Sequence, residues 1–96
     1  MKTLLRGGFV VSGRGRRRAD VLIDGEKIAA VGHIPPELAA QSEIVDVTGR
    51  LLFPGFIDAH THFDLDVCNT TTADNFDTGT RSALRGGTTM VVDFAC

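Results

Sequence analysis

The sequence predicts a mixed α/β fold in two parts, a β-rich segment over residues 1–53 and a strand–loop–helix–strand segment over residues 54–96. In the first part, short apolar runs alternate with turns rich in glycine and aspartate, which is typical of antiparallel sheets. In the second part, a segment with helical spacing lies between two apolar runs, as in a βαβ unit. Such a unit contains parallel strands with a right-handed crossover, so we expect residues 54–96 to open a parallel sheet.

The strands expected in the first part are short. They are Thr3–Leu5, Phe9–Val11, Ala19–Ile23, Lys27–Val31, Glu43–Val47 and Arg50–Phe53. Asp24-Gly25-Glu26 between two apolar runs is a strong hairpin signal. Pro35-Pro36 excludes a central strand at that point, and Glu37–Ala40 suffices for one helical turn. Together these signals predict part of an antiparallel sheet or sandwich.

Positive charge is concentrated at the start of the chain. Residues 1–19 contain six basic residues and no acidic one, whereas the remaining residues contain four basic and all 12 acidic residues. Four of the six bases fall within Gly13–Arg18, and no aromatic residue lies among them to stack on a base. A solvated turn between two strands is therefore favoured over a phosphate-binding patch, and we expect no nucleic-acid partner.

Length and composition exclude several classes of protein. A (β/α)8 barrel needs about 250 residues, so 96 residues cannot form a complete one. Cys68 and Cys96 form neither a CxxC motif nor a disulfide framework, and Cys68 is interpreted as a bystander in a polar loop. We see no secretory leader and no apolar run of membrane-spanning length, which favours a cytoplasmic protein with no membrane partner.

The second part contains four expected elements in order. They are a buried strand over Gly55–Ala59, a polar loop over Val67–Ala73, a helix over Asp74–Arg85 and a second buried strand over Thr88–Ala95. Asp74 or Thr72 is the expected helix cap, and Phe76, Thr80, Ala83 and Leu84 form its expected apolar stripe. Because the chain stops directly after a strand, we expect it to be the beginning of a longer protein.

The segment most informative about chemistry is PGFIDAHTHFD, residues 54–64. In a strand, residues two apart point to the same face, so His60 and His62 would stand side by side, with Asp58 and Asp64 extending the row. Two imidazoles at this spacing can chelate a Zn²⁺-class ion, and Asp58 would accept a hydrogen bond that fixes the tautomer of one of them. The alternative is a pair of ordinary strand-end histidines. The position of the pair at the carboxyl end of a buried strand favours the metal site.

These residues resemble a known family. Residues 54–64 resemble the first-strand metal motif of the amidohydrolase superfamily. The whole chain, including KTLLRGGFVVS, ADVLIDGEKIAAVG and TTADNFDTGTRSALRGGTTMVVDF, resembles the dihydropyrimidinase and D-hydantoinase group of cyclic amidases.

The resemblance implies an enzyme with two domains. Residues 1–53 would form part of a β-sandwich, and residues 54–96 would form the start of a (β/α)8 barrel that holds a binuclear metal centre, usually of zinc. His60 and His62 match two of the metal ligands, and the remaining ligands come later in the family's chain. The implied reaction is hydrolytic opening of a cyclic amide or ureide, a small-molecule substrate, by a metal-bridged hydroxide. The 96-residue chain alone is expected to be inactive.

The loop that follows His62 separates branches of the family. Dihydroorotases and allantoinases usually carry arginine two positions after the second histidine, whereas this chain has Asp64 followed by Leu65. An acidic residue would repel a substrate carboxylate, while Leu65 and Val67 would suit a neutral ring, so a dihydropyrimidinase or hydantoinase is favoured.

Two alternatives remain open. The chain could be a fragment of an allantoinase-like or dihydroorotase-like enzyme, or a non-catalytic β-rich assembly module whose strand edges pair with partner chains. The unsatisfied sheet edges also suggest a homo-oligomer.

Overall fold

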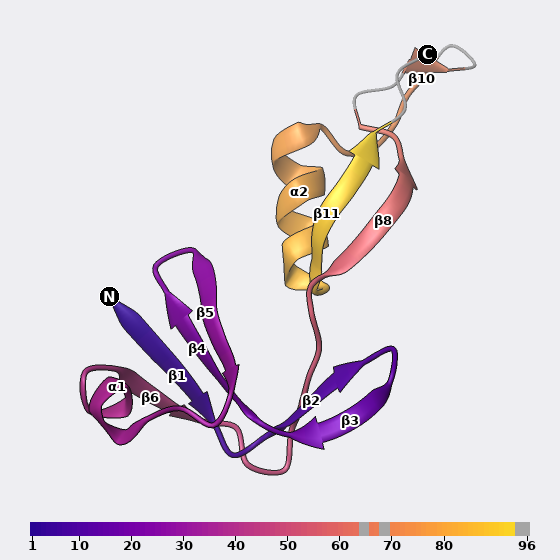
Figure 1. Cartoon of the computed structure of the whole chain (residues 1–96). Helices are drawn as coiled ribbons and strands as arrows, with labels where there is room; N and C mark the ends of the chain where they lie inside the picture. The colour runs from indigo at the N-terminus through magenta and orange to yellow at the C-terminus, as the bar shows by residue number, and fades with distance from the viewer. Residues whose placement is uncertain (64–65, 68–69, 94–96) are drawn as a thin grey trace. The chain divides into compact units, whose positions relative to one another are not determined.

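The computed structural model describes residues 1–63, 66–67 and 70–93. The chain divides into two compact units, Met1–Pro54 and Gly55–Cys96 (Figure 1). Each unit is described by itself below.

The first unit contains a four-stranded sheet with the order β5–β4–β1–β6. Its strands are β1 (Lys2–Arg6), β4 (Asp20–Asp24), β5 (Lys27–Gly32) and β6 (Glu43–Asp46). The Asp-Gly hairpin is confirmed, because Asp24 pairs with Lys27 across a two-residue turn in which Gly25 has a φ of 62°. Glycine adopts this left-handed conformation at low cost. The β1–β4 and β4–β5 pairs are antiparallel as expected, whereas the β1–β6 pair is parallel.

A second, three-stranded sheet in this unit has the order β3–β2–β7, formed by β2 (Phe9–Ser12), β3 (Gly15–Arg18) and β7 (Leu51–Leu52). The prediction of a basic turn was wrong for Arg16, Arg17 and Arg18. These residues form β3, which pairs with β2 in antiparallel register. The free backbone N–H and C=O groups of β2 can form hydrogen bonds with a neighbouring extended segment of any sequence. The arginine-rich strand β3 therefore pairs with β2 at the edge of the sheet, where charged side chains are tolerated. The β2–β7 pair is parallel.

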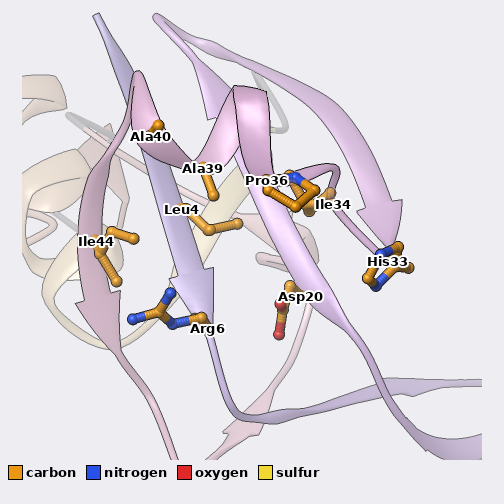
Figure 2. A pocket seen from close by; sticks show the side chains of 9 residues that line it. All are labelled: Leu4, Arg6, Asp20, His33, Ile34, Pro36, Ala39, Ala40 and Ile44. Atoms are coloured by element: carbon orange, nitrogen blue, oxygen red, sulfur yellow. The ribbon is translucent and has the colours of Figure 1, made fainter.

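A small hydrophobic core fills the space between the four-stranded sheet and α1 (Pro36–Ala40). Leu4, at 1% exposure, Leu22 and Ile34 form the buried cluster. Leu38 and Ala39 of α1 pack against it, as Figure 2 shows for Leu4, Ile34 and Ala39. The proline pair directs the chain into this single helical turn, because proline at the first helical position has no N–H to satisfy.

The second unit is a βαβ arrangement, as predicted. β8 (Phe56–Thr61) and β11 (Thr88–Asp93) pair in parallel, and α2 (Phe76–Arg85) connects them (Figure 1). β8 is longer than the expected Gly55–Ala59 and includes His60. A short antiparallel pair, β9 (Asp66–Val67) and β10 (Thr70–Thr71), lies where a loop was expected. Phe94 and Ala95, the expected end of the last strand, fall outside the described residues.

Helix α2 begins later than predicted. Asn75, rather than Thr72 or Asp74, is its N-cap. The Asn75 side chain accepts a hydrogen bond from the Thr78 N–H at 2.8 Å, and the Thr78 hydroxyl accepts one from the Asn75 N–H at 3.2 Å. This reciprocal pair is a capping box, which satisfies two otherwise unpaired backbone donors. Asparagine is as strong a cap as aspartate, so the spacing of charges alone could not locate the start.

The apolar side chains of the second unit are more exposed than the sequence suggested. Phe56 is 53% exposed and Ile57 is 64% exposed, although both lie in a strand expected to be covered on both faces. Phe76 and Leu84 of the expected helical stripe are also exposed. Gly79 is the buried residue of α2. No helix within the described parts of the chain is long and apolar enough to cross a membrane.

Candidate metal site

His60 and His62 lie together at the carboxyl end of β8. Their ring centroids are 5.0 Å apart and their planes meet at 71°. His60 is exposed and His62 is half-buried. The two side chains are therefore adjacent and reachable from solvent, as a pair of ligands for an incoming ion must be.

The spacing of these two rings fits a shared metal ion. Zinc–nitrogen bonds of about 2.0–2.1 Å at a tetrahedral angle place the centres of two imidazoles about 5 Å apart. The observed centroid separation of 5.0 Å is compatible with that value. Imidazole nitrogens are also preferred ligands for zinc-class ions, so both the geometry and the donor type fit.

Asp58 does not continue the row of histidines. Asp58 pairs with Val91 and Thr61 pairs with Asp93, so β8 advances three residues while β11 advances two. This register shift is of the kind that a β-bulge produces, and it resets the alternation of side chains. Asp58 and Thr61 consequently share one face, where both line a pocket of about 220 Å³ beside α2. His60 and His62 alternate with Thr61 and take the opposite face.

The Asp58 carboxylate nevertheless reaches the histidine segment. It accepts a hydrogen bond from the backbone N–H of His60 at 3.2 Å. This contact connects the carboxylate to the peptide backbone at the bulge. Asp58, His60 and His62 would form one row only in an uninterrupted strand. The register shift depends on the pairing of β8 with β11, which the sequence of β8 alone does not specify.

The other residues predicted for the site follow His62 in the sequence. Asp64 and Leu65 fall outside the described residues, and Val67 is described only as part of β9; Cys68, expected to be a bystander, also falls outside them. Over the described ranges, no group of three or more His, Cys, Asp or Glu side chains is arranged to hold a metal ion. Two protein ligands are fewer than the three typical of a catalytic zinc site.

A larger pocket lies in the first unit, well separated in sequence from His60 and His62. Its volume is about 480 Å³, and Figure 2 shows a floor of apolar side chains with Arg6, Asp20 and His33 at its edge. The Asp20 carboxylate is already engaged, since it accepts hydrogen bonds from the Gly7 N–H at 3.1 Å and from Arg18 at 2.7 Å.

These contacts also set the charge of Asp20. Burial raises the pKa of its carboxyl, but the hydrogen bonds from Gly7 and Arg18 and the charges of Arg18 and Arg6 together hold the pKa below its ordinary value. Asp20 is therefore an ionised structural anchor, which does not fit the role of a proton-transfer group.

Comparison with known proteins connects the histidine motif to a family. The amidohydrolase family model matches residues 51–96, which include all of β8, α2 and β11. The D-hydantoinase of Geobacillus stearothermophilus is 43% identical over 94 residues, covering 98% of this chain and 20% of that protein. Residues 51–96 thus match the amidohydrolase family.

Solved structures of family members superpose on nearly all of the chain. The dihydropyrimidinase of Brevibacillus agri NCHU1002 is 50% identical with a TM-score of 0.89, covering 98% of this chain and 20% of its own. A D-hydantoinase from Bacillus sp. AR9 is 48% identical with a TM-score of 0.87, again covering 98% of this chain and 20% of that one. A D-aminoacylase described as having a binuclear metal centre is 37% identical with a TM-score of 0.69, covering 98% and 18%.

These similarities agree with the predicted resemblance to dihydropyrimidinases and D-hydantoinases, and with the predicted mixed α/β fold. The chain spans about a fifth of the length of the relatives it matches.

Proposed function

We propose that this chain supplies the first metal-binding strand of a metal-dependent hydrolase that opens cyclic amide rings. The observation that carries the proposal is the histidine pair on β8, with ring centroids 5.0 Å apart, within the segment that matches the amidohydrolase family. The relatives named D-hydantoinase and dihydropyrimidinase support hydantoin or dihydropyrimidine rings as the substrate class.

In this proposal, residues 1–53 form part of a β-sandwich and residues 54–96 form the first strands of a (β/α)8 barrel. His60 and His62 each offer one imidazole nitrogen to a zinc-class ion, and further ligands come from outside the 96 residues. A bound ion of this class lowers the pKa of its water and polarises a carbonyl oxygen. The binuclear centre named for the D-aminoacylase supports a site for two ions.

The chain's own residues have distinct tasks in this arrangement. His60 and His62 hold the ion at the carboxyl end of a parallel strand, where barrel enzymes place their chemistry. Asp58 secures the backbone at His60. Asp64, Leu65 and Val67 contribute to the wall of the substrate pocket, where an acidic and an apolar group favour a neutral ring over a substrate carboxylate.

A chimera tests the proposal. The segment of the G. stearothermophilus D-hydantoinase that aligns with this chain would be replaced by residues 1–96, and hydantoin hydrolysis and bound metal would be measured. We expect an active, metal-containing chimera. His60→Ala or His62→Ala should reduce kcat at least about a hundredfold and lower the metal content, because each removes a metal ligand.

His33→Ala is the matched control, since His33 is exposed in the first unit and belongs to neither strand of the βαβ unit. This variant should retain the activity of the unsubstituted chimera. A folded chimera whose activity and metal content are unaffected by His60→Ala would contradict the proposal.

A further inference from the structure

The two residues on either side of His62 each donate one cross-strand hydrogen bond to the end of β11. The Thr61 hydroxyl donates to the Val92 carbonyl oxygen at 3.0 Å. The Phe63 N–H donates to the Asp93 carboxylate at 3.1 Å. These contacts bracket the histidine in the sequence, so they restrict the backbone from which its imidazole projects.

The bulge in β8 makes this restriction important. In an uninterrupted strand, His60 and His62 would share a face with Asp58, which lines the pocket beside α2. A bulge leaves one residue without a regular ladder partner, so the strand end needs other contacts to retain one register. Thr61 and Asp93 are themselves register partners immediately after the bulge.

The side chain of Phe63 provides a second anchor. Its ring meets the Phe76 ring edge-to-face, with centroids 5.6 Å apart. The same ring lies against Gly79 so closely that a Cβ at Gly79 would overlap it. The residue after His62 is therefore held by β11 through its backbone and by α2 through its ring.

We propose that Asp93 is a positioning residue for the histidine pair, which acts with Thr61 to hold the bulged end of β8 so that both imidazoles present to one ion. This inference rests on the proposed metal-binding function of His60 and His62. Asp93 itself acts through the backbone N–H of Phe63, and its essential feature is an acceptor oxygen at that position.

The test compares Asp93→Ala with Asp93→Asn in the 96-residue chain. Asparagine keeps an oxygen that can accept the Phe63 N–H, whereas alanine removes it. The first readout is the nuclear Overhauser effect between the His60 and His62 rings in metal-free protein. We expect its intensity to fall at least threefold in Asp93→Ala and to stay near the wild-type value in Asp93→Asn. Asp77→Ala, which removes an exposed carboxylate of α2, is the matched control and should also match wild type.

The second readout is Co²⁺ binding, followed by the visible absorption of the ion. We expect the apparent affinity to fall about tenfold in Asp93→Ala and to be retained in Asp93→Asn, in the range found for residues that orient metal ligands. A ring contact that is equally strong in wild type and Asp93→Ala would overturn the positioning role, as would Asp93→Asn behaving like Asp93→Ala.

The two readouts separate this inference from the proposed function. A ring contact that depends on Asp93 in a chain that binds no Co²⁺ supports positioning and counts against the metal site. If Asp93→Ala loses the helical circular dichroism of α2, this variant is unfolded, and Thr61→Val then tests the positioning role. That isosteric change removes only the hydroxyl bonded to Val92, and it should weaken the ring contact at least twofold. An unchanged contact in Thr61→Val would then overturn the inference.

Discussion

The two units of this chain differ in how far their apolar side chains are buried. Every buried hydrophobic residue that the structure describes belongs to the first unit; these residues are Leu4, Ala19, Val21, Leu22, Ile34 and Val47. In the described part of the second unit the one buried residue is Gly79. The exposed apolar side chains of the second unit include those of Phe56, Ile57 and Met90.

Because of this difference, we expect the two units to contribute differently to stability and to the proposed metal site. The first unit has a core between a sheet and a helical turn, and burial of apolar surface is the main source of folding free energy. The second unit has the histidine pair, but its parallel strands lack the cover that such strands normally have on both faces. We therefore infer that the first unit accounts for most of the chain's stability, while the second contains the proposed metal site.

The largest expected effect tests the core of the first unit. Leu4→Ala removes the most deeply buried side chain and should lower the free energy of unfolding of that unit by about 2–5 kcal/mol, because it leaves a cavity beside Leu22 and Ile34. Urea denaturation with amide signals of β1 and β4 as probes measures this change. Ile28→Ala, at a position that is 67% exposed, should change it by less than about 0.5 kcal/mol. Equal effects of the two substitutions would contradict the inference that the buried core stabilises the first unit.

A substitution in α2 tests how the second unit is held together. Gly79→Ala would ordinarily stabilise a helix by about 1 kcal/mol. Here the added Cβ would overlap the Phe63 ring, so we expect a net loss of about 1–3 kcal/mol from overpacking. Ser82→Ala on the exposed surface of the same helix is the control and should not destabilise it. A gain in the thermal midpoint of Gly79→Ala would show that the Phe63 contact is dispensable.

The capping box of α2 should contribute a smaller amount. Asn75→Ala removes the acceptor for the Thr78 N–H and should cost about 1 kcal/mol, measured as a fall in helical circular dichroism at intermediate urea concentrations. Asn75→Asp keeps the acceptor and should behave like wild type. If Asp74→Ala had the larger effect, the helix would begin where the charge pattern suggested.

The smallest expected effect is a pH dependence confined to the first unit. The pKa of Asp20 is lowered on folding, so the stability from its ionised form is present above about pH 4, near its unfolded value, and is lost as the pH falls through the lower folded value. Asp20→Asn should flatten the acid limb of the stability curve of the first unit while leaving α2 unaffected. If Asp20→Asn lost stability at low pH as steeply as wild type, other carboxyl groups would be responsible for that loss, which would contradict the prediction.

Much of the fold could be predicted because its signals are local. The hairpin at Asp24-Gly25 and the order of strand, helix and strand in the second unit depend on turn chemistry and spacing within a few residues. The parallel pairing of β1 with β6 depends on contacts between residues about 40 positions apart, and short alternating runs do not specify such partners.

The same distinction applies to the site. The HxH spacing identified His60 and His62 because their proximity follows from a short stretch of strand. The bulge, which removes Asp58 from their face, and the contact of Asp93 with Phe63 depend on how β8 and β11 pair. The register of the two strands pairs Asp93 with Thr61, and the Asp93 carboxylate accepts a hydrogen bond from the backbone N–H of Phe63.

A zinc titration followed by the imidazole NMR signals tests the central claim most directly. The chain has three histidines, so His33 serves as an internal control in the same sample. We predict that His60 and His62 shift together along one binding curve, while His33 stays unchanged over that range of zinc concentration. Independent midpoints for His60 and His62, or a shift of His33 along the same curve, would contradict a shared metal site on β8.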